Sequence, residues 1–298
     1  MTRKTKNTIS TILRYVVLCA VGVLMFYPML WMVGASLKAD NNEIYSTISF
    51  IPKNPSFAAY VKGWTATGYS FGKFMMNTYI IVFPKVVGIV ISTIITAYGF
   101  SRFQFVGKTF LFAVLMSTLF LPQVVLNIPQ FLMFTDLGWV DTYKPLIVPS
   151  FFANEPYFVF MLVQFMRSVS KEMEEAAEID GCSKGKFFFY FVPQLSKAIL
   201  AVLTLYYAVA YWNDYMKGLL YIDKSSLYPL QIVLRGILIE TQSLANDFAD
   251  VSQIEAKMKL AESMKYGTIV VAIIPPLILY PIVQKYFEKG VMIGAVKG

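Results

Sequence analysis

The chain has 298 residues, of which 57% are hydrophobic and 15% charged, and its formal net charge at pH 7 is +8. Together with a mean hydropathy of +0.58, this composition is typical of a membrane protein with several spanning segments and excludes an ordinary water-soluble globule. The chain has no His, which excludes His-based general bases, His metal ligands and the catalytic triads that need them. We predict no catalytic residue, no metal site and no cofactor.

Six apolar segments are long enough to cross a bilayer, which takes about 20 residues per helix. Backbone groups in lipid must be satisfied within the segment, so the spans are helices. We therefore predict an all-α fold with six transmembrane helices in a single domain over residues 1–298. The predicted spans are Tyr15–Leu37, Thr78–Phe100, Thr109–Leu132, Pro145–Met166, Ile199–Tyr221 and Thr268–Phe287.

The distribution of Lys and Arg predicts the orientation. If both termini are cytoplasmic, fourteen basic and six acidic residues fall on the cytoplasmic side, and their difference equals the whole net charge of +8. We therefore predict a multi-pass protein of the cell membrane (plasma or inner membrane) with both termini inside. The basic balance follows from topology and gives little support to nucleic-acid binding.

Two ionisable residues inside predicted spans lie next to a proline. Lys85 follows Pro84 in the second span, and Glu155 lies between Asn154 and Pro156 in the fourth. Such groups are expensive in a membrane and usually face a cavity or one another, and broken helices near the midplane are recurrent substrate sites. Lys85, Asn154 and Glu155 are therefore candidates for a substrate pathway. Pairing with a partner subunit, or snorkelling to the interface, is an equal alternative.

Aromatic and polar side chains gather late in the fifth span. Tyr207 and Tyr211 are four residues apart, on one helical face, and Trp212 and Asn213 follow directly. Sugars present apolar C–H faces and many hydroxyls, which suit stacking aromatics and amide partners. These four residues are further candidates for the pathway. The alternative is that they belong to the aromatic belt found at membrane interfaces in general.

A short charged helix is predicted in the loop between the fourth and fifth spans, about residues 167–197. Its residues favour helix, a glycine suits its end, and two adjacent alanines would let another surface approach closely. We predict that it docks on a partner that moves it; the alternative is an ordinary solvated loop helix. The candidate docking residues are Glu174, Glu175, Ala176, Ala177, Asp180 and Gly181.

This loop resembles the EAA motif of the membrane subunits of ATP-binding cassette (ABC) importers, and most resembles the maltose-type carbohydrate permeases. The matching residues are Glu175–Ala177, Asp180–Gly181, Pro193 and Leu195–Lys197, with Gln194 standing where the family usually has proline. Segments 97–103, 211–214 and 289–298 are also similar to this family. Within it, the chain is most similar to the LplC-type polysaccharide and oligosaccharide permeases of Gram-positive bacteria.

The resemblance implies a type I ABC importer permease that forms half of a translocation pathway for carbohydrate. Its implied partners are a second homologous permease, two ABC ATPase subunits that hydrolyse ATP, and an extracytoplasmic sugar-binding lipoprotein, all at the membrane lipid. The docking helix over residues 175–181 would couple the chain to the ATPases. The long extracytoplasmic loop, about residues 222–267, would touch the binding protein.

A rival of another class is a secondary sugar transporter that couples to an ion gradient through Glu155 or Lys85. Six spans, a docking-type loop and the lack of a repeated half argue against it. A membrane-embedded enzyme is a weaker rival, because the sequence has no His and shows no cluster of candidate catalytic groups. The sequence does not name the sugar, its length or its charge.

Overall fold

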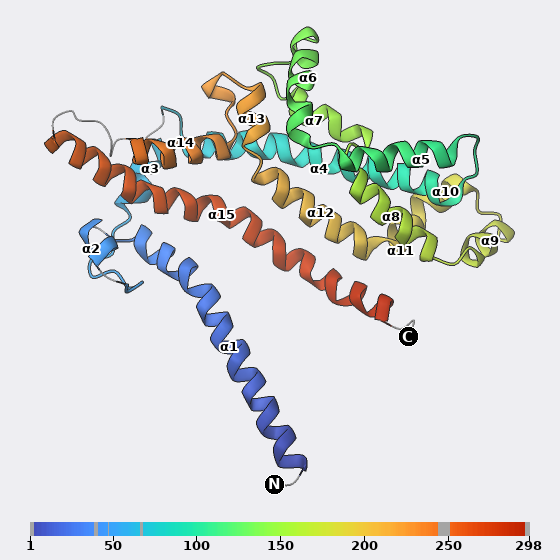
Figure 1. Cartoon of the computed structure of the whole chain (residues 1–298), viewed down its shortest axis with the longest axis horizontal. Helices are drawn as coiled ribbons and strands as arrows, with labels where there is room; N and C mark the ends of the chain where they lie inside the picture. The colour runs from blue at the N-terminus through green and yellow to red at the C-terminus, as the bar shows by residue number, and fades with distance from the viewer. Residues whose placement is uncertain (1–2, 39–40, 47, 66–67, 244–250, 296–298) are drawn as a thin grey trace. The chain divides into compact units, whose positions relative to one another are not determined.

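The computed structural model describes residues 3–38, 41–46, 48–65, 68–243 and 251–295. Within these ranges the chain is helical and has no strand, apart from one isolated bridge between Lys38 and Pro55, which confirms the predicted all-α class (Figure 1). The helices in chain order are α1 (Arg3–Ser36), α2 (Asn41–Ser46), α3 (Ala58–Thr65), α4 (Phe71–Arg102), α5 (Lys108–Ser117), η1 (Thr118–Phe120), α6 (Gln123–Asp136), α7 (Lys144–Ile147), η2 (Val148–Phe152), α8 (Pro156–Ser168), α9 (Glu172–Ile179), α10 (Lys184–Tyr190), α11 (Val192–Leu195), α12 (Lys197–Trp212), α13 (Met216–Tyr221), η3 (Ser225–Leu227), α14 (Leu230–Ser243) and α15 (Val251–Ala295).

The spans fit the predicted count of six when each bent pair of helices is counted as one. Four segments of the described chain are long and apolar enough to cross a membrane alone: Ser10–Ser36, Phe71–Arg102, Lys144–Ser168 and Met264–Tyr286. The two bent pairs are Lys108–Phe120 with Gln123–Asp136, at 105°, and Lys184–Leu195 with Lys197–Trp212, at 73°.

The third and fifth predicted spans are not the single helices that hydropathy indicates. The third breaks after η1, where Leu121 and Pro122 are extended. The fifth, predicted as Ile199–Tyr221, consists of α12 and the separate helix α13. Asn213 ends α12 because its side-chain amide donates to the Val209 carbonyl at 2.9 Å. Short polar side chains compete for backbone hydrogen bonds in this way and end helices.

The extracytoplasmic loop predicted at residues 222–267 is largely helical. It contains η3, α14 and the first part of α15, while residues 244–250 lie outside the described ranges. The sixth predicted span, Thr268–Phe287, lies within α15, a helix of 45 residues. Its apolar stretch is thus one part of a longer helix that begins in the predicted loop.

The described residues form two compact units, Met1–Gly72 with Leu234–Ile273, and Lys73–Val233 with Ile274–Gly298. In the first unit, the end of α1 packs closely on the segment that follows α2. A Cβ atom on Gly34 would overlap the backbone of Phe50, so only glycine fits there. The Ser36 hydroxyl bonds the Tyr60 hydroxyl at 2.6 Å. The single domain predicted over residues 1–298 stays a prediction.

The second unit is built around α4, which takes part in three buried apolar clusters. Ile81 joins a cluster with α6, α7 and α13, Val86 and Ile89 join one with α8 and α12, and Ala97 and Tyr98 join one with α8, α10 and α11. The three clusters follow one another along α4, from Ile81 to Tyr98. The helix therefore connects the packing of α6, α7 and α13 at one end of the unit with that of α10 and α11 at the other.

The fourth span is broken between η2 and α8, as expected for a segment with Pro156. Ala153 has a left-handed backbone, with φ at +49°. The Ser92 hydroxyl of α4 secures the break, because it donates to the Ser150 carbonyl at 2.9 Å and accepts from the Ala153 N–H at 3.1 Å. Backbone groups freed by a break in a membrane need such partners. The break places Asn154 and Glu155 beside α4.

Candidate functional site

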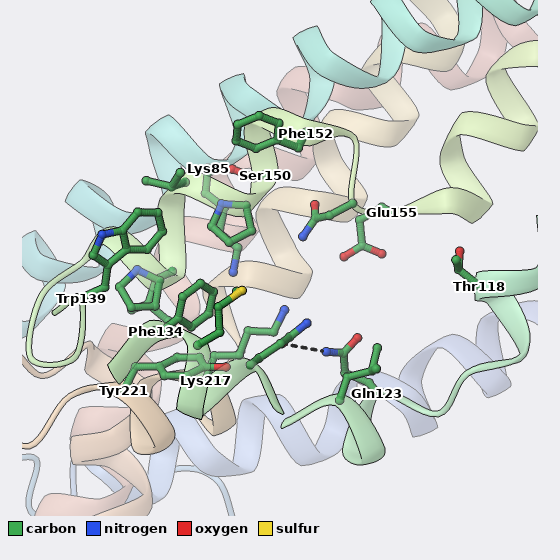
Figure 2. A pocket seen from close by; sticks show the side chains of 18 of the residues that line it. Lys85, Thr118, Gln123, Phe134, Trp139, Ser150, Phe152, Glu155, Lys217 and Tyr221 are labelled. Carbon is green, nitrogen blue, oxygen red and sulfur yellow. Dashed lines mark hydrogen bonds between the residues drawn. The ribbon is translucent and has the colours of Figure 1, made fainter. Parts of the chain in front are cut away.

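A cavity of about 550 Å³ lies inside the second unit, between α4, α6, α13 and the break in the fourth span. Lys85, Asn154 and Glu155, three of the predicted pathway residues, line it. Figure 2 shows Glu155 and Gln123 projecting into the same space, with Phe134, Trp139 and Tyr221 grouped along one side. The cavity therefore combines charges, amides and aromatic rings.

Lys85 carries a buried positive charge at the wall of this cavity. Its ammonium lies 3.6 Å from the Asp214 carboxylate, and the two side chains are 5% and 21% exposed. The same ammonium lies over the Tyr211 ring, 3.9 Å from the centroid. A carboxylate and an aromatic face are the two common ways of stabilising a cation in an apolar environment. The pair ties α4 to the segment between α12 and α13.

Asp214 and Lys217 are charged residues of the site that the sequence analysis missed. One Asp214 carboxylate oxygen accepts from the Lys217 N–H at 3.2 Å, which caps the start of α13. The Lys217 side chain lines the cavity. The available signal was that both lie inside the predicted fifth span, where ionisable residues are expensive.

The four aromatic and amide candidates divide between different surroundings. Tyr207 and Tyr211 are buried, with stacked rings 5.6 Å apart, in the cluster behind Lys85, and neither lines the cavity. Trp212 packs against Tyr79 with ring centroids 5.2 Å apart and lines a separate apolar groove. Asn213 is exposed and accepts from the Gln231 amide at 3.4 Å. Among these four, Tyr211 contacts the charged wall through the Lys85 ammonium.

The loops at this end of the unit are tied by Asp141, which has a left-handed backbone with φ at +60°. Its carboxylate accepts from the N–H groups of Asp223 and Lys224 at 2.7 and 3.1 Å. These two hydrogen bonds lower the pKa of the Asp141 carboxyl. Its own N–H donates to the Tyr221 carbonyl at 2.8 Å. The contacts hold the end of α13, and hence Tyr221, at the cavity.

The predicted docking segment forms α9 and ends as the glycine suggested. Gly181 has φ at +79°, its N–H donates to the Glu178 carbonyl at 3.0 Å, and the Cys182 N–H donates to the Ala177 carbonyl at 2.8 Å. This pair of bonds is the Schellman motif, which requires a left-handed residue and usually glycine. Asp180 lies at the last position before the turn.

The two faces of α9 differ in exposure. Glu175 and Ala176 are exposed, as are Met173 and Ile179, which are 45% and 87% exposed. Ala177 is partly buried on the apolar cluster formed by α4, α8, α10 and α11. The outward face thus combines apolar side chains with a carboxylate, which suits contact with another protein surface.

Glu174 points the other way, toward the end of α4. Its carboxylate lies 3.4 Å from Arg102 Nε and accepts from the Tyr98 hydroxyl at 3.1 Å. Glu174 and the exposed Glu175 are both candidate docking residues by sequence. Helical spacing separates neighbours by about 100°, which is why the two carboxylates face different partners.

The whole chain matches one family of proteins. The family of binding-protein-dependent transport system inner membrane components matches residues 7–293. The polygalacturonan/rhamnogalacturonan transport system permease protein YtcP of Bacillus subtilis (strain 168) is 31% identical over 98% of this chain and 100% of its own length. Protein LplC of the same organism is 32% identical over 93% of this chain and 91% of its own length.

Two further similarities concern other sugars and the fold. The melibiose/raffinose/stachyose import permease protein MelC of Bacillus subtilis (strain 168) is 30% identical over 97% of this chain and 96% of its own length. A chain in the crystal structure of a bacterial ABC transporter involved in the import of the acidic polysaccharide alginate has a TM-score of 0.77, with 24% identity over 96% of this chain and 99% of that chain. This second likeness supports the type I importer permease fold.

Proposed function

The chain belongs to the family of binding-protein-dependent transport system inner membrane components, so it is a membrane-embedded permease subunit of an ABC importer, and we propose that its substrate is a carbohydrate. Hydrolysis of ATP belongs to separate subunits of such importers. The substrate passes through the permease without bond chemistry. The role of this chain is therefore to hold the sugar and to respond to its partners.

One observation carries the carbohydrate proposal, the composition of the cavity walls. Trp139 offers an aromatic face, Gln123 and Gln130 offer amides, and Lys85 and Glu155 offer charged hydrogen-bonding groups. Stacking on C–H faces and hydrogen bonding to hydroxyls are the two interactions that sugars need. The relatives named for transport of polygalacturonan/rhamnogalacturonan and for import of melibiose, raffinose and stachyose support the same class.

The proposed complex has this chain as one half of the pathway. A second homologous permease would form the other half, two ABC ATPases would dock inside, and a sugar-binding lipoprotein would dock outside. We place α9 on the ATPases, with both termini in the cytoplasm, because its outward face carries Met173, Ala176 and Ile179 around Glu175. Closure of the ATPases would move α9 as a rigid lever and so switch access to the cavity.

The test of this function is uptake by purified complex in sealed vesicles. The chain is purified in complex with the second permease, the ATPases and the binding protein. The vesicles are then supplied with ATP, labelled oligosaccharide and ionophores that abolish ion gradients. We expect uptake that requires both ATP and the binding protein. Uptake that stops with the ion gradients and ignores ATP would instead establish the secondary transporter.

We expect Glu155→Gln to reduce sugar uptake per complex by about threefold to tenfold, the size of one hydrogen bond to a neutral group. Basal ATPase activity and docking of the binding protein should stay near the wild-type level, because the substitution affects only the contact with the sugar. Uptake and complex yield are measured together. If Glu155 instead holds the two permeases together, the yield of complex falls before uptake per complex does, and the pathway assignment is wrong.

A further inference from the structure

We propose that Glu174 is a positioning residue that fastens α9 to α4, so that movement of α9 reaches the cavity through α4. The inference rests on the proposed docking of α9 on the ATPases and adds the route by which that movement travels. Its basis is a cluster of three polar side chains, Glu174 on α9 with Tyr98 and Arg102 on α4. In the sequence, Glu174 lies 72 residues after Arg102 and 76 residues after Tyr98.

The cluster is well placed to hold the two helices together. Both oxygens of the Glu174 carboxylate are used, one by Arg102 Nε at 3.4 Å and the other by the Tyr98 hydroxyl at 3.1 Å. The side chains of Arg102 and Glu174 are only 8% and 14% exposed. Hydrogen bonds to a charged group are stronger than neutral ones, and partial burial reduces their screening by water and salt. The contact therefore persists under physiological salt.

Arg102 also holds the chain that leads into α9. Its Nη2 donates to the Val169 carbonyl at 3.0 Å, and Val169 is the extended residue that ends α8. One guanidinium thus contacts both the start of the connecting segment and the first turn of the helix it leads to. In the same region, Ala177 and Cys182 pack at the edge of the apolar cluster with two small side chains.

The other end of the route is the cavity. α4 is one continuous helix from Phe71 to Arg102, and Lys85 on its wall lies 17 positions before Arg102, about 25 Å along the helix axis. A helix of this kind, packed along its whole length, transmits displacement as a rigid rod. Movement of α9 thereby reaches the Lys85–Asp214 pair directly, in addition to any movement carried by α8 and α10.

A second ion pair on α9 provides the matched control. Glu178 lies 3.7 Å from Lys184, but these side chains are 45% and 60% exposed. Exposed pairs of this kind contribute little. Glu178→Gln removes the same charge from the same helix as Glu174→Gln, without touching α4. The two variants therefore separate the loss of a carboxylate from the loss of the anchor.

The experiment measures sugar imported per ATP hydrolysed, using the purified complete complex in vesicles. We expect Glu174→Gln to lower this ratio about tenfold, with complex yield and basal ATPase activity near wild type and Glu178→Gln unchanged. Arg102→Gln should lower it at least as much, because it also releases Val169. The double variant should lower it by less than the two single effects combined, because both substitutions remove the Glu174–Arg102 contact. An unchanged ratio in Glu174→Gln, or effects of the two substitutions that simply add, would overturn the proposal.

A second measurement reports the anchor itself. In a Cys19→Ser background, Cys182 is the remaining thiol of the chain, and it lies partly buried at the turn after α9. We expect maleimide to label Cys182 several-fold faster in Glu174→Gln than in Glu178→Gln. Equal labelling would overturn the anchor even if import were impaired. Absence of ATP-driven import by the wild-type complex would count against the proposed function. The labelling result does not depend on import, so the two failures can be distinguished.

Discussion

Asp214→Asn is expected to cost the second unit about 3 kcal/mol of stability, because it leaves the Lys85 ammonium buried without its carboxylate. The Lys85 side chain is 5% exposed, and it keeps its contact with the ring of Tyr211. Asparagine still caps the start of α13, so the variant tests the charge alone. The measurement is the thermal midpoint of the purified complex, together with its yield from the membrane.

The matched control is Asp223→Asn, which neutralises an exposed carboxyl nine residues further along and should leave both quantities unchanged. A second variant separates stability from transport. Lys85→Met combined with Asp214→Asn removes both charges and should recover most of the lost stability, since a buried pair replaced as a unit costs little. If the Lys85 charge contributes to the pathway, sugar import by this double variant should be below the wild-type level even though its stability is recovered. A thermal midpoint for Asp214→Asn equal to wild type would show that Lys85 does not depend on this carboxylate.

Hydropathy alone was enough for the fold class and for the number of spans. Apolar runs such as Tyr15–Leu37 and Thr78–Phe100 overlap the helices α1 and α4, because burial in lipid leaves few other arrangements. The same index averages over short polar interruptions. It therefore missed the breaks at Pro122 and at Asn213–Tyr215, where one proline or one capping side chain redirects the backbone.

The site was partly predictable for a similar reason. An ionisable residue in an apolar run is conspicuous, and so Lys85 and Glu155 were singled out and both line the cavity. Their partners could not be found locally. Asp214 pairs with Lys85 across 129 positions of sequence, and Glu174 with Arg102 across 72. Such pairs are set by helix packing, which spacing along one helix does not reveal.

The docking helix shows the boundary between the two kinds of information. Its end was predictable, because a glycine after a run of good helix formers is a local signal. The direction in which each carboxylate faces was not, since it depends on where α4 ends. Glu174 and Glu175, adjacent in sequence, accordingly enter different tests, one of the anchor to α4 and one of the outward face.

Gly181→Val is expected to lower sugar import per complex about tenfold, because the left-handed backbone that ends α9 is unfavourable for valine. The φ angle at this position is +79°, and a Cβ atom there would meet nothing within 4 Å. Conformation, and not space, therefore determines the effect. Forcing an ordinary residue into the left-handed region costs roughly 1–2 kcal/mol, which corresponds to a factor of about 5–30 in the population of the native turn.

The turn matters for coupling because it sets where the chain goes after α9. The Cys182 N–H bonds back to Ala177, and both side chains pack on the apolar cluster shared with α4 and α8, so a lost turn tilts the outward face away from its partner. Gly181→Asn should retain most of the import, since asparagine enters the left-handed region readily, and Gly185→Ala, in the helical α10 with open space around it, should be silent. Import, ATPase activity and yield are compared across the three variants. Wild-type import by Gly181→Val would mean that the Schellman turn does not position α9. Equal loss of import in Gly181→Asn would mean that the added side chain, and not the backbone conformation, causes the effect.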